Sequence, residues 1–125
     1  DCGILLGKLF LEALGDKKGI ARYGSMNLPM DEVLCNVTLD ISGRPYLVFN
    51  CELTRENIGT MSCEMVEEFF RAFCVAAGVT LHINVYYGKN DHHKVEAIFK
   101  AFGRALKQAV KIESDRIPRS KGVIE

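Results

Sequence analysis

The pattern of hydrophobic and polar positions divides the chain into helical and extended segments. Apolar residues recur at helical spacings over residues 2–14, and Gly15 follows where a C-terminal cap glycine is expected. Residues 16–32 hold glycines, a proline and several charges without a clear period, which predicts a loop. Strict alternation over residues 33–41 predicts a strand with one buried side.

The next segment predicts a hairpin. Residues 42–45 read Ser-Gly-Arg-Pro, which is typical of a turn, and residues 46–53 form a second apolar stretch. We therefore expect residues 33–41 and 46–53 to pair as antiparallel neighbours.

The second half of the chain predicts helix, strand and helix. A helix is expected over residues 62–77 with Ser62 as its N-cap, followed by an alternating strand over residues 79–87. Asn90 or Asp91 then caps the last and longest helix. This order of elements predicts an α+β fold with helices packed on one face of a sheet.

Composition excludes several classes of protein. The chain has 125 residues, enough for one domain with its own core. Sixteen basic and sixteen acidic residues give no net charge, so neither nucleic acid nor a membrane surface is an expected partner. No apolar run reaches the length of a bilayer span, and no secretory signal is expected. Five cysteines without CxxC spacing favour free thiols in a reducing cytoplasm.

The sharpest chemical signal is the sequence His-His-Lys-Val-Glu at residues 92–96. On a helix, Glu96 shares a face with either His92 or His93. Adjacent histidines diverge by about 100° around the helix, which favours two metal ions that each take one imidazole. Imidazole with carboxylate suits Mn, Fe or Zn. From the spacing alone, a solvated helix start with two surface histidines fits equally well.

Other polar groups leave two interpretations open. His82, on the polar side of a predicted strand, either reaches the same site or hydrogen-bonds within the sheet. Asp31 and Glu32 form either an acid–base pair or a polar loop. A cluster of acidic side chains on the helix over residues 62–77 is more often a solvated face than a set of metal ligands. Its members are Glu64, Glu67 and Glu68.

Basic residues in loops provide a candidate phosphate site. Arg22 and Arg44 lie in loops with glycine or proline, where a guanidinium can bind a phosphate through two N–H groups. Arg119, Ser120 and Lys121 would add two cations and a hydroxyl. Taken singly, each basic side chain is better explained as a solvated surface group.

A short internal echo links two parts of the chain. An offset of 96 residues lays Gly7 on Gly103 and Lys8 on Arg104, and both segments are predicted helices. If the halves are duplicated units, a partner of the His-His-x-x-Glu motif would lie just before Asp1.

Many ordered segments together resemble one enzyme family. In one-letter code they are EALGDKKGI (12–20), RYG (22–24), PMDE (29–32), DISGRPY (40–46), TLHI (80–83), GKNDHH (88–93), Glu96, FKAFGRAL (99–106) and SKG (120–122). Along nearly its whole length the chain resembles imidazoleglycerol-phosphate dehydratase.

The resemblance implies a fold of duplicated β/α half-domains (ribosomal protein S5 domain 2-like), with helices on one face of a mostly four-stranded sheet in each half. On this interpretation the chain is a single, partial domain. A first half-domain remnant covers about residues 1–50 and lacks its N-terminal strands, and the second covers about residues 51–125. Members of the family form trimers that assemble into a 24-subunit homo-oligomer in the cytoplasm.

The resemblance also implies an activity and a metal site. Such a hydro-lyase dehydrates D-erythro-imidazole glycerol phosphate to imidazole acetol phosphate in histidine biosynthesis, usually with two Mn(II) ions that bind the substrate's imidazolate. The implied metal ligands are His92, His93 and Glu96. Glu68 stands where many members have a histidine ligand, with Glu67 as the alternative. Glu96, or a carboxylate upstream of Asp1, would act as general base.

By the same resemblance, Arg22 and Arg44 bind substrate, Ser120 and Lys121 bind its phosphate, and Arg119 adds positive charge. The family's first His-His-x-x-Glu motif ends just before Asp1, so we expect this chain to be inactive by itself. Two alternatives remain open. One is a di-metal phosphoester hydrolase that uses the same motif, and the other is a non-catalytic, truncated assembly module.

Overall fold

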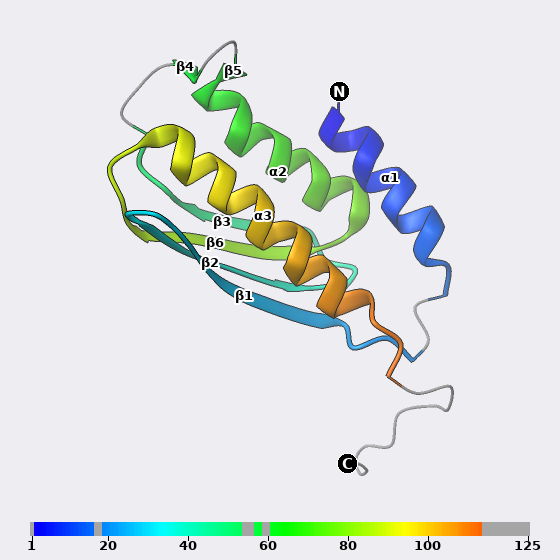
Figure 1. Cartoon of the computed structure of the whole chain (residues 1–125). Coiled ribbons are helices and arrows are strands. Elements are labelled where there is room, and N and C mark those ends of the chain that lie inside the picture. Colours follow the sequence, from blue (N-terminus) through cyan, green and yellow to red (C-terminus); the bar gives the residue numbers. More distant parts are fainter. Residues whose placement is uncertain (1, 17–18, 54–56, 59–60, 114–125) are drawn as a thin grey trace.

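The structure, a computed structural model, describes residues 2–16, 19–53, 57–58 and 61–113 (Figure 1). Three helices and four main strands account for most of these residues. In chain order the elements are α1 (Cys2–Leu14), β1 (Tyr23–Met30), β2 (Val33–Asp40), β3 (Tyr46–Asn50), β4 (Asn57–Ile58), β5 (Met61–Ser62), α2 (Cys63–Ala77), β6 (Thr80–Tyr87) and α3 (Asp91–Val110).

The main sheet has the strand order β1-β2-β6-β3. β2 pairs antiparallel with both β1 and β6, whereas β3 runs parallel to β6. The predicted hairpin between the strands at residues 33–41 and 46–53 is therefore wrong, because β6 lies between them. Parallel strands need a crossover connection, and α2 provides it between β3 and β6. In the turn after β2, the Gly43 N–H donates a hydrogen bond to the carbonyl of Gly78, which lies between α2 and β6, at 2.7 Å.

The loop predicted over residues 16–32 is also wrong in its second half, which forms β1. β1 lies at the edge of the sheet, where a proline such as Pro29 removes no necessary ladder hydrogen bond. Gly24 is needed because α3 passes close by, and an added Cβ would collide with the backbone carbonyl of Ala105. The two residues that suggested a loop are therefore compatible with an edge strand under a helix.

α2 and α3 lie side by side over one face of the sheet, as the sequence predicts (Figure 1). The core between these layers is apolar. The Phe70 ring lies 4.9 Å from Phe99 and 5.1 Å from Phe102 between ring centroids, and below them Val37 and Ile83 are fully buried. The predicted α+β architecture is confirmed.

The other face of the sheet is polar and carries ladders of hydrogen-bonded side chains. The Asn36 amide donates to Asn27 at 2.9 Å, and Asn50 donates to Asn84 at 2.8 Å. His82 belongs to this face, since its neighbours Leu81 and Ile83 point into the core. The helices and the polar ladders therefore occupy opposite sides of the sheet.

α1 packs along α2 rather than on the sheet (Figure 1). Gly3 and Gly7 make this approach possible, because a Cβ at Gly7 would lie 2.6 Å from the Ala76 Cβ. Both segments of the sequence echo are helical, as predicted, although Gly103 has open space around it. The division into half-domains near residue 50 stays a prediction. Among the described residues, no helix is long and apolar enough to cross a membrane.

Candidate functional site

The first turn of α3 fixes the positions of the two adjacent histidines. Asn90 is the N-cap, with extended backbone angles, and its side chain accepts a hydrogen bond from the His93 N–H at 3.1 Å. Of the two caps that the sequence allowed, the structure therefore has Asn90. Asp91 is the first helical residue and is 2% exposed.

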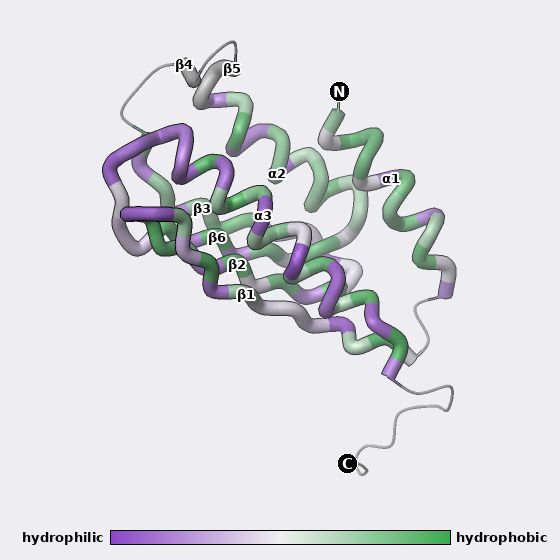
Figure 2. The backbone as a smooth tube through the Cα atoms, viewed as in Figure 1, coloured by the Kyte–Doolittle hydropathy of each residue, from purple (hydrophilic) through white to green (hydrophobic). Residues whose placement is uncertain are grey.

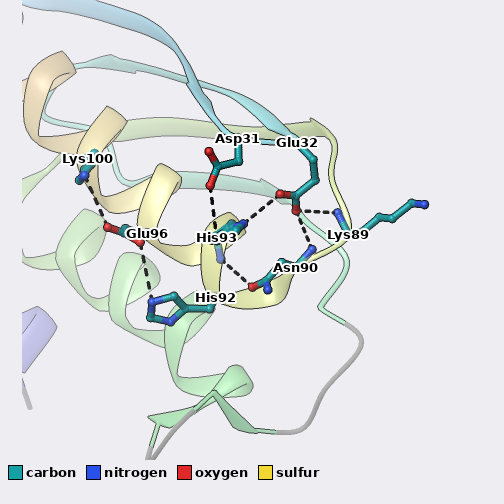
Figure 3. A network of polar contacts seen from close by, with 8 residues as sticks. All are labelled: Asp31, Glu32, Lys89, Asn90, His92, His93, Glu96 and Lys100. Carbon is teal, nitrogen blue, oxygen red and sulfur yellow. Dashed lines mark hydrogen bonds and ion pairs between the residues drawn. The ribbon is translucent and has the colours of Figure 1, made fainter.

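The two imidazole rings diverge, as helical geometry predicts. Their centroids are 6.5 Å apart and their planes are inclined by 56°. In Figure 3, His92 points along the helix toward Glu96, whereas His93 points toward the turn between β1 and β2. The His92 Nε2 lies 3.7 Å from a Glu96 carboxylate oxygen, and Glu96 lies 3.5 Å from the Lys100 ammonium. Glu96 therefore shares its face with His92.

His93 faces the acidic pair at the β1–β2 turn, 61 residues away in the sequence. Its Nδ1 is 2.9 Å from the Glu32 Oε1, and its Nε2 is 3.7 Å from an Asp31 carboxylate oxygen. The other Glu32 oxygen accepts the backbone N–H groups of Lys89 and Asn90 at 3.1 and 2.8 Å. The sequence left this acidic pair open, and the structure brings it to the metal motif.

Hydrogen bonds shift the pKa values of both partners in this contact. The backbone N–H of Asn90, and then the His93 side chain, lower the pKa of Glu32 to about 2. The hydrogen bond to Glu32 raises the pKa of His93 above its ordinary value. Glu32 is therefore an ionised acceptor at any physiological pH.

A buried lysine inside the motif holds the first turn of α3 in place. Lys94 is 6% exposed, and its ammonium donates to the Glu52 carbonyl at 2.7 Å and lies 3.9 Å from the Asp91 carboxylate. Because Glu52 follows β3, this contact ties α3 to the far edge of the sheet. Sequence reasoning missed this role, since a lysine between two ligand candidates looks like a solvent-facing residue.

The other sequence candidates for metal binding lie apart from this turn. Glu68 is exposed on α2. His82 lies on the polar face of the sheet, where its ring centroid is 6.5 Å from that of Tyr46. Over residues 2–16, 19–53, 57–58 and 61–113, no three or more His, Cys, Asp or Glu residues gather closely enough to hold a metal ion.

The donors that are present suit a divalent transition metal. His92 with Glu96, and His93 with Asp31, each place one imidazole nitrogen beside one carboxylate, which is the ligand chemistry of Mn, Fe or Zn. Two donors do not complete a coordination shell. The geometry therefore fits two partial metal sites on different faces of one helix turn, each needing further ligands.

The predicted substrate arginines lie at the opposite end of the sheet. The Arg22 guanidinium donates to both Asp40 oxygens at 2.6 and 3.2 Å and lies 5.1 Å from the Tyr23 ring centroid, and Asp40 raises the pKa of Arg22. Arg44 is exposed, and its carbonyl accepts a hydrogen bond from Thr80 at 2.9 Å. Asp40 pairs in register with both Tyr23 and Thr80, which places this group at one end of the strands.

A strand length separates the two groups. β1 has eight residues, which span about 25 Å at about 3.3 Å per residue. Arg22 precedes this strand and Asp31 follows it, so the structure does not bring the arginines to the histidines of the same chain. The remaining predicted phosphate ligands, Arg119, Ser120 and Lys121, lie outside the described residues.

Comparison with known proteins decides the family. A sequence model described as imidazoleglycerol-phosphate dehydratase matches residues 1–106. The chain belongs to this family. The resemblance inferred from the sequence segments is therefore confirmed.

Individual members of the imidazoleglycerol-phosphate dehydratase family are similar over almost the whole chain. The chain is 60% identical to the enzyme of that name from Clostridium botulinum and covers 64% of its length. It is 57% identical to the one from Clostridioides difficile and covers 65% of that protein. In both comparisons 99% of this chain is aligned. The chain thus spans slightly less than two thirds of these relatives.

Solved structures of the family share the fold. The imidazoleglycerol-phosphate dehydratase from Staphylococcus aureus superposes with a TM-score of 0.85 at 55% identity, covering 88% of this chain and 64% of that one. The Pyrococcus furiosus enzyme gives a TM-score of 0.83 at 36% identity, covering 99% of this chain and 68% of that one. These superpositions agree with the half-domain fold that the resemblance implied.

Proposed function

We propose that this chain supplies catalytic and binding groups to an imidazoleglycerol-phosphate dehydratase. This hydro-lyase converts D-erythro-imidazole glycerol phosphate to imidazole acetol phosphate in histidine biosynthesis, and we expect it to act in the cytoplasm. The observation that carries the proposal is the diverging pair His92 and His93, each beside a carboxylate, in a chain of this family.

The proposed metal ions are two, with Mn(II) as the first choice and other divalent ions possible. His92 and Glu96 would hold one ion, and His93 would hold the other. Glu68, or Glu67 beside it, is proposed as a further ligand. When bound, the ions supply Lewis acidity that stabilises negative charge on the substrate's imidazole ring.

The proton transfer needs a carboxylate near the reacting carbon. Glu96 is one candidate, since its side chain is 41% exposed and points away from the core. As general base it takes the C–H proton, the neighbouring hydroxyl departs as hydroxide, and this proton completes the departing water. The resulting enol tautomerises to the ketone. A carboxylate from elsewhere in the assembled enzyme is the alternative base, with Glu96 then acting only as a ligand.

Arg22, Arg44, Arg119, Ser120 and Lys121 are proposed to hold the phosphate and so to orient the glycerol chain. The strand length between the described arginines and the histidines supports a site shared between chains. In that arrangement the histidines of one subunit meet the arginines of another. We therefore propose a homo-oligomer, built from trimers into a 24-subunit assembly.

A direct assay tests the proposed function. The purified protein is freed of metal and then supplied with Mn(II), and imidazole acetol phosphate formation is followed with metal content. For the 125-residue chain by itself we expect no turnover, because each of its partial metal sites has only two donors among the described residues. In a protein completed to the length of its relatives, we expect turnover that depends on the added ion, and His92→Ala should lower both the metal content and the turnover. Hydrolysis of a generic phosphoester would favour the di-metal hydrolase. Metal-independent assembly of the completed protein without turnover would favour a non-catalytic module.

A further inference from the structure

Glu32 uses both carboxylate oxygens to join three segments of the chain. One oxygen accepts the backbone N–H groups of Lys89 and Asn90 in the loop before α3. The other faces the His93 Nδ1 at 2.9 Å. Figure 3 shows these contacts converging on Glu32 from the β6–α3 loop and from the first turn of α3.

This arrangement determines where the His93 ring carries its hydrogen. An ionised carboxylate only accepts hydrogen bonds, so the Nδ1 beside Glu32 must be the donor. In the neutral ring the hydrogen then lies on Nδ1, and Nε2 keeps its lone pair. That nitrogen lies on the Asp31 side, 3.7 Å from the carboxylate.

We propose that Glu32 is a positioning residue that keeps the His93 hydrogen on Nδ1 and so presents Nε2 as the metal-binding nitrogen. A carboxylate that accepts the second N–H of an imidazole fixes both the tautomer and the ring orientation of a metal ligand. This inference rests on the proposed function for its metal. The tautomer itself is a property of the metal-free chain.

The backbone around Glu32 is set up to hold this carboxylate still. Asp31, the preceding residue, has a left-handed φ of 52°. On the opposite side, Gly88 packs so closely on Val33 that an added Cβ would lie 2.6 Å from the Val33 Cγ2. The turn and the loop are therefore in contact next to these hydrogen bonds.

Glu32→Gln provides a sharp test because it retains the shape of the side chain. The oxygen that accepts two backbone N–H groups must remain an oxygen, since an amide NH₂ there would face two donors. The NH₂ group then faces the His93 Nδ1 and can only donate. The variant should therefore move the hydrogen of the neutral ring to Nε2, the nitrogen that the metal needs.

Two measurements on the full chain test whether Glu32 sets the tautomer of His93 and strengthens metal binding. ¹⁵N NMR of labelled histidine in the metal-free protein, at about pH 9 where imidazoles are neutral, identifies the tautomer of His93. Titration with Mn(II) gives the affinity. We expect the Nδ1–H form in the unmodified chain, the Nε2–H form in Glu32→Gln, and Mn(II) binding weakened about tenfold or more by the variant.

Glu12→Gln is the matched control. It makes the same chemical change at an exposed carboxylate on α1 that has no proposed role in the metal site, and it should alter neither the tautomer nor the affinity. Circular dichroism verifies that both variants fold.

The two proposals fail in different ways. An unchanged Nδ1–H tautomer in Glu32→Gln would overturn the positioning role, whatever the metal result. Loss of Mn(II) affinity in Glu12→Gln equal to that in Glu32→Gln would also overturn it. An unmodified enzyme that binds no Mn(II) would instead overturn the proposed function, while the tautomers still test Glu32.

Discussion

The two ends of β1 share the same backbone feature but carry different side-chain groups. Among the described residues, Arg22 and Asp31 are the non-glycine residues with left-handed φ, at 77° and 52°, and they flank the strand at its two ends. Each end holds a charged pair, Arg22 with Asp40 at 2.6 Å and His93 with Glu32 at 2.9 Å. Strained backbone of this kind gathers at functional sites, so both ends are candidates.

The two pairs differ in how firmly they are built. Arg22 and Asp40 come from adjacent ends of neighbouring strands, and the arginine side chain is 45% exposed. Glu32 instead accepts two backbone N–H groups as well as the imidazole. Figure 2 shows hydrophilic residues gathered at the β1–β2 turn and the start of α3. The end that holds Asp31, Glu32 and His93, the proposed metal end, is thus preorganised. The end that holds Arg22, Asp40 and Arg44, the arginine end, is more open to solvent.

The largest expected effect is on turnover, in variants that are each damaged at one end. Mixing two such variants tests whether a site combines the ends of two subunits. Arg44→Ala and His92→Ala should each lower turnover by about 100-fold or more, since the first removes a group proposed to orient the substrate and the second a proposed metal ligand. If each site combines the metal end of one chain with the arginine end of another, mixed oligomers regain unmodified sites. With equal amounts and random assembly, about a quarter of the sites are restored.

This recovery is measured after co-expression or after denaturation and refolding of the two variants together. A mixture of His92→Ala with His93→Ala is the control and should recover nothing, because both changes damage the same end. A mixture of Arg44→Ala and His92→Ala that stays as inactive as its parts would show that one chain supplies both ends.

Gly88→Ala should damage the metal end alone. Gly88 has a φ of 149°, and an added Cβ would lie 2.6 Å from the Val33 Cγ2 and 3.2 Å from its Cα. The loop must shift, and with it the N–H groups that hold Glu32. We expect a loss of about 1–3 kcal/mol in the free energy of unfolding, together with weaker Mn(II) binding.

Gly43→Ala is the matched control at the arginine end. Gly43 also has a left-handed φ, of 84°, but no atom lies within 4 Å of an added Cβ. Urea denaturation should show a loss of stability here too, without any change in Mn(II) affinity. Equal losses of Mn(II) affinity in both glycine variants would contradict the separation of the two ends.

Asn90→Ala should have a smaller effect, limited to the helix cap. The Asn90 side chain accepts the His93 N–H at 3.1 Å, whereas its backbone N–H donates to Glu32 and survives the change. Loss of the cap costs about 1 kcal/mol of stability. Thermal or urea unfolding measures this, and Asn90→Ser, which keeps a capping oxygen, should recover most of it. Mn(II) affinity that falls as far as in Gly88→Ala would place the cap inside the metal site.

The contacts at these two ends that could be predicted from the sequence are those between residues close together along the chain. The cap at Asn90, the divergence of the two histidines and the helix that carries them depend on neighbours within one or two turns. The contact between His93 and Glu32 spans 61 residues, and it depends on which strands pair. Periodicity does not report pairing, so the role of Glu32 was left open.

The errors in the predicted fold also come from contacts between residues far apart in the sequence. β1 was missed because Gly24 and Pro29 are typical of loops, although an edge strand beneath α3 accepts both. The hairpin was wrong because two alternating stretches close in sequence look like partners, whereas β6 takes the place between them. Family resemblance supplied the site residues but could not show that Arg22 and His93 lie a strand length apart.

Asp40→Asn should have the smallest effect on stability and the most specific effect on function. An ion pair as exposed as Arg22 with Asp40 contributes about 0–1 kcal/mol, so unfolding should barely change. The asparagine still offers one oxygen to the guanidinium but removes the second hydrogen bond and the charge, so Arg22 is held less firmly in its strained backbone position. We expect a raised KM for the phosphate substrate with kcat and Mn(II) content nearly unchanged. Should the variant lose Mn(II) while KM stays constant, Arg22 and Asp40 would belong to the metal end, and the comparison between the two ends of β1 would be wrong.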